Sequence, residues 1–239
     1  MYTDSLLGRI FSLQDQVTAR HISQNPDRFS LLSDALALLS AIDMSPAEWD
    51  AIPVQMRSLF NYFHADTFSC IVSSARLCFH GCSADAFALM RVALENLTIL
   101  DYIASKGLYQ DAFAEMQQRA ARGKPFSDAF SYDRAISVLQ ITDRRTRLWG
   151  QMSAMGSHAS PPRLSLALAK RGEGHRTKPG LSLDDPNIPH VLGELTSLTL
   201  FALRVVNDFL KLYAPLSQVT FSMKLVSLEA RYEALKPEQ

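Results

Sequence analysis

Apolar residues recur with helical spacing along most of the chain. They occupy positions i, i+3 and i+4 and show no sustained alternation, which is typical of amphipathic helices. Proline, glycine and Asn-Pro steps interrupt this pattern and mark helix ends. The spacing therefore predicts an all-α protein, with helices near residues 3–22, 27–42, 53–80, 83–106, 108–121, 127–139, 143–157, 190–213 and 216–235.

Several of these helices carry clear start and stop signals. In "SPAEW", Ser45 can cap a helix, Pro46 suits its first position, and Glu48 occupies the capping-box position, so a short helix is expected there. Ser83 is expected to cap the next long helix, and Gly107 to end it. The short turn between the two longest central helices predicts an antiparallel hairpin at the centre of a multi-helix bundle.

One segment departs from the helical pattern. Residues 161–189 combine prolines, a "GEG" turn and alternation at Leu164, Leu166 and Leu168, which is typical of strands. A small β-hairpin or an ordered loop is expected there. The chain shows no internal repeat and no linker, so residues 1–239 are interpreted as a single helical domain.

Composition and charge narrow the class of protein. The chain is 47% hydrophobic, and its 24 Lys and Arg balance its 24 Asp and Glu. A balanced charge provides no global field for nucleic acid or an anionic membrane, although it leaves room for a local patch. Arg204, Asn207 and Asp208 interrupt the longest apolar segment, so no transmembrane helix and no membrane partner are expected.

The cysteines and the N-terminus suggest a location. Cys70, Cys78 and Cys82 are an odd number clustered in the sequence, and the first residues lack the basic start and apolar run of a signal peptide. A reducing cytoplasm is therefore expected. "CFHGC" lacks the second ligand pair of a zinc site, and no Gly-rich phosphate loop follows a strand. We expect buried free thiols, no metal and no cofactor.

The most informative stretch is the central helix, which is apolar on nearly all sides yet carries Arg91 and Glu95. At about 100° per residue these two side chains share a stripe with Thr98. In one interpretation they neutralise each other inside the bundle and tie neighbouring helices together. In the other, they line a polar cleft in which the planar guanidinium donates two parallel hydrogen bonds to a phosphate or a carboxylate.

A second polar group lies in "SAMGSHASPP". His158 is expected near a helix end, where it is either a proton carrier at neutral pH or a residue favoured by the helix dipole. Ser153 and Ser157 accompany it. The basic run "DRRTRLW" can contact a phosphate backbone or form a solvated helix face, so nucleic acid remains a possible partner.

Two of these motifs carry a resemblance. "ALMRVALENLTILDYI" followed by "SAMGSHASP" is similar to a broad group of uncharacterised all-helical bacterial and mobile-element proteins, in which an Arg-x-x-x-Glu helix precedes a Ser-and-His segment. That group looks distantly like the HEPN helical domains. The resemblance covers about residues 60–160. It implies a helical fold and a site at Arg91, Glu95 and His158.

The chain departs from the HEPN ribonuclease pattern in one respect. Those enzymes carry an Arg-x(4 to 6)-His motif, and here the arginine that precedes His158, Arg147, is too far away. Arg57 and His64 match the spacing but precede the central hairpin, so we interpret the match as chance. The ribonuclease chemistry is therefore not implied by the motif.

Two functions follow from the sequence. The first is a helical binding module that pairs with a protein partner or with itself as a homo-oligomer, through the apolar surface of the two C-terminal helices. The second is an RNA- or nucleotide-directed enzyme of HEPN type, with Arg91, Glu95 and His158 as candidate catalytic residues. We favour the binding module.

Overall fold

The structure is a computed structural model that describes residues 6–122, 126–141, 144–154 and 187–236. These residues form an all-α multi-helix bundle, as the apolar spacing predicted, and the described part of the chain contains no strand. The helices are α1 Leu6–Gln24, α2 Pro26–Ser40, α3 Pro46–Ala51, α4 Val54–Phe79, α5 Ser83–Lys106, α6 Tyr109–Ala120, the 3-10 turn η1 Asp128–Phe130, α7 Tyr132–Leu139, α8 Arg144–Met152, α10 Ile188–Tyr213 and α11 Pro215–Ala234.

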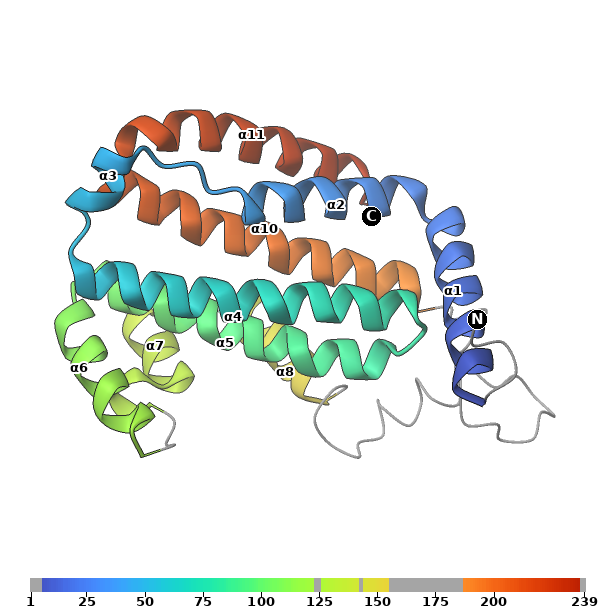
Figure 1. The fold of residues 1–239 in the computed structure, drawn as a ribbon, viewed down its shortest axis with the longest axis horizontal. Helices are drawn as coiled ribbons and strands as arrows, with labels where there is room; N and C mark the ends of the chain where they lie inside the picture. Colours follow the sequence, from blue (N-terminus) through green and yellow to red (C-terminus); the bar gives the residue numbers. More distant parts are fainter. Residues whose placement is uncertain (1–5, 123–125, 142–143, 155–186, 237–239) are drawn as a thin grey trace.

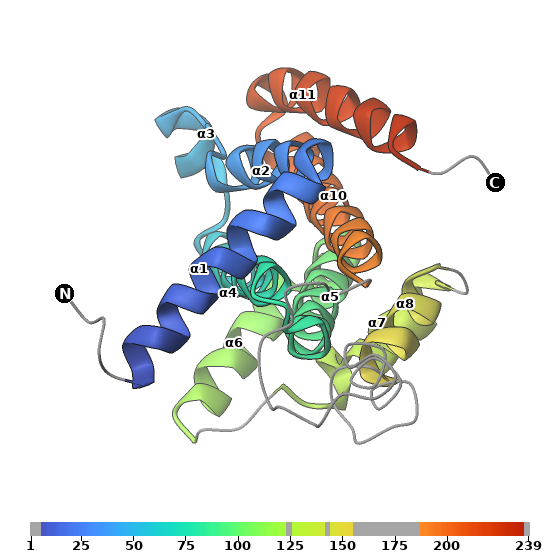
Figure 2. The same ribbon diagram turned by 90° about the vertical axis from the view of Figure 1, so that its right-hand side faces the viewer.

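The long helices lie roughly along one direction and stack in layers (Figure 1). α11 forms one outer edge, α2 and α10 lie beneath it, and α4 and α5 follow. α6, α7 and α8 cover the opposite side, and the view along the bundle shows the same order (Figure 2). α10 packs against α2, α4, α5 and α11, so it shares the centre with the predicted hairpin.

The central hairpin of α4 and α5 is confirmed. Gly81 makes its turn with φ of 75°, a left-handed conformation that glycine adopts without steric cost. Ser74 donates a buried hydrogen bond to the carbonyl of Ala86, with 3.1 Å between the two oxygens, and so joins the helices next to the turn. Leu94 and Leu97 are buried, which confirms that α5 is surrounded by other helices.

Aromatic packing fixes α10 against the hairpin. The rings of Phe60 in α4 and Phe209 in α10 stack with centroids 4.0 Å apart, and both side chains are buried. Such aromatic pairs add stability beyond the apolar area that they bury. The core therefore continues from the hairpin into the C-terminal helix pair.

Two local predictions were wrong. Ser83 does not cap α5, because it is already the first helical residue and Cys82 holds the N-cap position. The single helix expected over 127–139 is divided into η1 and α7, because Ser131 adopts an extended conformation and caps α7 through the backbone N–H of Arg134. Apart from Asn187, the N-cap of α10, and the first two residues of that helix, the expected β-hairpin lies outside the described residues.

Candidate functional site

Arg91 and Glu95 meet on the surface of α5 that faces α8. The Arg91 Nε atom donates a hydrogen bond to Glu95 Oε1 over 2.9 Å. Helical spacing of four residues places the two side chains beside each other, so the pair forms within one helix. One of the two interpretations of the sequence included this pairing.

Trp149 of α8 completes the cluster. Its indole Nε1 donates to the same Glu95 Oε1 atom over 2.7 Å, and the Arg91 guanidinium carbon lies 4.7 Å from the centre of its ring. The ring of Tyr132 in α7 stacks on Trp149 with centroids 5.4 Å apart. The cluster therefore ties α5 to α7 and α8 through a carboxylate, a cation and two aromatic rings.

The pair is not sealed in the core. The side chains of Arg91 and Glu95 are 27% and 28% exposed, which corrects the interpretation of a buried pair. In α8, Leu148 is buried, whereas Trp149, which contacts the pair, is only partly buried. The pair lies at the edge of the contact between α5 and α8, where water reaches both charges.

The third candidate residue, His158, lies outside the described residues, as does Ser157. Ser153 directly follows α8 and is partly buried. The structure therefore brings Arg91 and Glu95 together with Trp149 and does not test the predicted role of His158. Trp149 was not predicted as a contact of Glu95, because the sequence placed it only beside the basic run.

The other polar candidates occupy separate places. Arg147 is exposed on α8, consistent with a solvated face. Cys78 is buried, whereas Cys70 and Cys82 are partly buried, and none of the three is in a disulfide. Burial and the nearby charge of Asp66 raise the pKa of Cys70 to about 11. The described residues contain no group of three or more His, Cys, Asp or Glu that could hold a metal ion.

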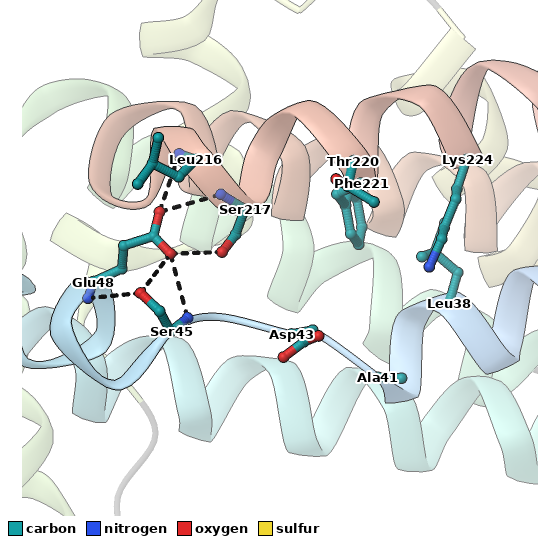
Figure 3. A pocket seen from close by; sticks show the side chains of 10 residues that line it. All are labelled: Leu38, Ala41, Asp43, Ser45, Glu48, Leu216, Ser217, Thr220, Phe221 and Lys224. Carbon is teal, nitrogen blue, oxygen red and sulfur yellow. Dashed lines mark hydrogen bonds between the residues drawn. The ribbon is translucent and has the colours of Figure 1, made fainter.

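Glu48 accepts several hydrogen bonds from two separate helix starts. Its Oε1 atom accepts from the backbone N–H groups of Leu216 and Ser217 over 3.0 and 3.1 Å. Its Oε2 atom accepts from the Ser217 hydroxyl over 2.6 Å and from the Ser45 hydroxyl over 2.9 Å (Figure 3). The predicted capping box of α3 is confirmed, and the same carboxylate also caps the first turn of α11.

This network changes the chemistry of the carboxyl. Hydrogen bonds from Ser217 and then from Ser45 lower the pKa of Glu48 from 4.5 to about 2, against an opposing effect of desolvation. These hydrogen bonds favour the charged form of the carboxyl, which suits its role as a cap of both helices. The network fixes the start of α11 beside α3.

A groove of about 400 Å³ between α2 and α11 lies next to this network, lined by Leu38, Asp43 and Lys224 among others (Figure 3).

α11 presents a second apolar face to solvent. Its core face consists of Phe221, Leu225 and Leu228, which are buried. On the opposite side of the helix, an outer stripe consists of four apolar residues with large exposed fractions. These are Leu216 (80%), Val219 (59%), Met223 (71%) and Val226 (60%).

Comparisons with known proteins do not assign this surface. No protein-family model, curated protein or solved structure matches the chain. The resemblance to HEPN-like helical proteins therefore stays a hypothesis. None of the helices in the described ranges combines the length and apolar character of a membrane span.

Proposed function

We propose that this protein is a non-catalytic helical interaction module that binds another protein chain through the outer stripe of α11. The observation that carries the proposal is the exposure of Leu216, Val219, Met223 and Val226 on one side of one helix. Single exposed apolar residues are common on protein surfaces, whereas a contiguous row of them marks an interaction site. A helix that is apolar on two opposite faces is expected to be covered on both.

The position of α11 supports this function because the helix is held firmly. Glu48 fixes its first turn. Near its other end, Arg231 donates to Asp34 of α2 over 2.7 Å, and the Tyr232 hydroxyl donates to the carbonyl of Gly193 over 3.3 Å. A binding face on a helix anchored at both ends is pre-organised, so a partner loses less free energy in ordering it.

Site-specific photo-crosslinking tests the interaction. A photoreactive residue replaces Met223 in the full chain, expressed in the cells from which the protein derives, and a second variant carries it at exposed Val72 of α4 as the matched control. We expect covalent protein adducts from position 223 that position 72 does not give. If position 223 gives no such adduct, the proposed function is wrong.

The second candidate is an RNA- or nucleotide-directed enzyme that uses Arg91, Glu95 and His158. The exposure of the Arg91 and Glu95 side chains favours it, since a catalytic pair has to be accessible. Their engagement with each other and with Trp149 favours the structural role more strongly. Incubation of the purified chain with pooled RNA, next to a His158→Ala variant, tests it: RNA cleavage that depends on His158 supports an enzyme.

A further inference from the structure

The outer stripe of α11 has the spacing of a coiled-coil seam. Its four residues follow one another at intervals of three, four and three, which are the intervals between a and d positions of a heptad. At 1.5 Å per residue the stripe extends over about 15 Å of the helix. A surface of this form fits another helix laid along it.

We infer that the stripe pairs with the same stripe of a second copy of this chain, with the two α11 helices antiparallel about a two-fold axis. This inference rests on the proposed function and names the partner of that surface. Two-fold pairing requires a surface that is complementary to itself. The order of the four stripe residues along α11 meets this requirement, because an antiparallel pair of α11 helices brings apolar residues of the two copies together at each level of the stripe.

In an antiparallel pair of helices, a positions of one helix lie beside d positions of the other. The register that uses the whole stripe places Leu216 beside Val226 of the second copy and Val219 beside Met223 of the second copy. Symmetry repeats both contacts, which gives four apolar layers. A register shifted by one heptad would pair only two of the four stripe residues with each other, Leu216 with Val219 in one direction and Met223 with Val226 in the other.

The residues that flank the stripe are also compatible with a second copy. Thr220 and Ser222 flank the stripe nearest the two-fold axis, so each uncharged side chain lies close to its own equivalent. Glu229 and Arg231 form ion pairs within the chain, with Arg204 and Asp34. The seam therefore places no like charges against each other at its centre, and its uncharged flanks do not suit a polyanion such as RNA.

The apolar area that two outer stripes can bury is small, as expected for a weak dimer. Each stripe side chain carries on the order of 100 Å² of apolar surface, so the eight side chains of two copies cover about 500 Å² at their present exposure. Because homodimer interfaces are about 65% apolar, the interface amounts to about 800 Å², which is below the size of standard specific interfaces and in the range of weak, transient contacts. The dimer is therefore expected to dissociate at micromolar concentrations.

The oligomeric state of the purified chain provides the first test. Sedimentation equilibrium from about 1 to about 200 µM should show a mass that rises from one chain toward two. Met223→Lys places a charge in the seam and should raise the dissociation constant at least about tenfold, whereas Val72→Lys, on exposed α4 surface, should not change it. A wild-type chain that is monomeric throughout, or a Met223→Lys chain that dimerises like the wild type, overturns the inference.

Cross-linking between two different variants tests the antiparallel register. A mixture of Val219→Cys and Met223→Cys chains should form a disulfide-linked dimer under mild oxidation faster than either variant alone, with the wild-type chain and its three cysteines as background. Equal rates in all samples overturn this register. The outcomes also separate the two proposals: photo-crosslinks in cells to other proteins, with a monomeric purified chain, contradict self-pairing and leave the interaction module standing.

Discussion

Helices α5 and α11 both carry apolar residues on opposite faces, yet they occupy different surroundings. α5 is enclosed by α4, α7, α8 and α10, and Phe87 and Ile103, which lie about 160° apart around the helix, are both inaccessible to water. In the described part of the chain, α11 packs mainly against α2 and α10 and meets α3 at its first turn, so Phe221 is buried and Met223 is exposed. Similar patterns of apolar residues therefore lead to a core helix in one place and to an uncovered surface in the other.

The polar residues of the two helices sharpen this difference. α5 carries its charge pair at the edge of its contact with α8, where Arg91 and Glu95 bond to each other and to Trp149. The outer stripe of α11 carries no charge, although it is far more exposed. The partners that surround a helix, more than its own hydropathy, decide which of its faces remain available for binding.

The largest expected effect is on the enclosed helix. Leu94→Asp would place an unpaired charge among buried side chains, which costs more than most single substitutions and exceeds the stability of many domains of this size. We expect the variant not to fold. Circular dichroism and denaturant unfolding measure this.

Met223→Asp on α11 is the matched control, because it introduces the same charge on a helix of similar length. It should retain the helical spectrum of the wild-type chain. If Leu94→Asp melted within about a degree of the wild type, α5 could not be enclosed as described.

The helices were predictable because their signals are local. Ser45, Pro46 and Glu48 specify the start of α3 within four residues, and Gly107 ends α5 in the left-handed conformation that glycine favours. The division of residues 127–139 was missed because nothing in the apolar spacing distinguishes a 3-10 turn followed by a cap from one continuous helix.

The long-range contacts of the candidate sites were not predictable in the same way. Trp149 reaches Glu95 across 54 residues, and Glu48 reaches Leu216 across 168. One signal was available: α11 begins with Pro215 and has no acidic residue in its first turn, so its exposed N–H groups need an acceptor from elsewhere. The sequence does not reveal which carboxylate supplies it, because that depends on how the helices pack.

The next largest loss of stability is expected from substitutions in the pair of Arg91 and Glu95, measured as a double-mutant cycle. Glu95→Leu removes the acceptor of both Arg91 and Trp149, and we expect it to lower the free energy of unfolding by about 1 to 2 kcal/mol, since the pair is partly exposed to water. Arg91→Met should cost less than about 1 kcal/mol, because Glu95 keeps its bond from Trp149. Denaturant unfolding measures both.

The double variant decides whether the two side chains act together. Arg91→Met with Glu95→Leu should be more stable than the sum of the single losses predicts, because neither charge is then left alone. Additive losses would mean that the hydrogen bond between Arg91 and Glu95 contributes nothing to stability. A loss of more than about 3 kcal/mol for either single variant would mean that the pair is buried after all.

The contribution of Glu48 to the stability of the fold depends on pH. Folding lowers the pKa of this carboxyl from 4.5 to about 2, so its contribution to stability is complete above about pH 4.5 and is lost as the pH falls toward 2. Glu48→Gln should therefore be less stable than the wild type at pH 7, with the difference closing through that acidic range. Thermal melting as a function of pH measures it.

Ser217→Ala provides the control for this pH dependence. The hydroxyl of Ser217 is the largest cause of the lowered pKa, so its removal should move the pKa of Glu48 back toward 4.5 and narrow the range over which stability changes. A Glu48→Gln chain with the same acid transition as the wild type would show that the network does not hold α11 in solution.

The smallest effect on the stability of the single chain is expected at the outer stripe. Met223→Lys exchanges one good helix former for another at a position that is already in water, so it should change the free energy of unfolding by less than about 0.5 kcal/mol in dilute solution. Dimer formation stabilises the folded state, and it does so more strongly as a larger fraction of the chains is dimeric. The melting temperature of the wild type should therefore rise with protein concentration. That of Met223→Lys should stay constant, and the two chains should diverge only above the micromolar range. Equal melting temperatures at every concentration would show that the outer stripe of α11 is solvent-exposed in solution and is not covered by a second copy.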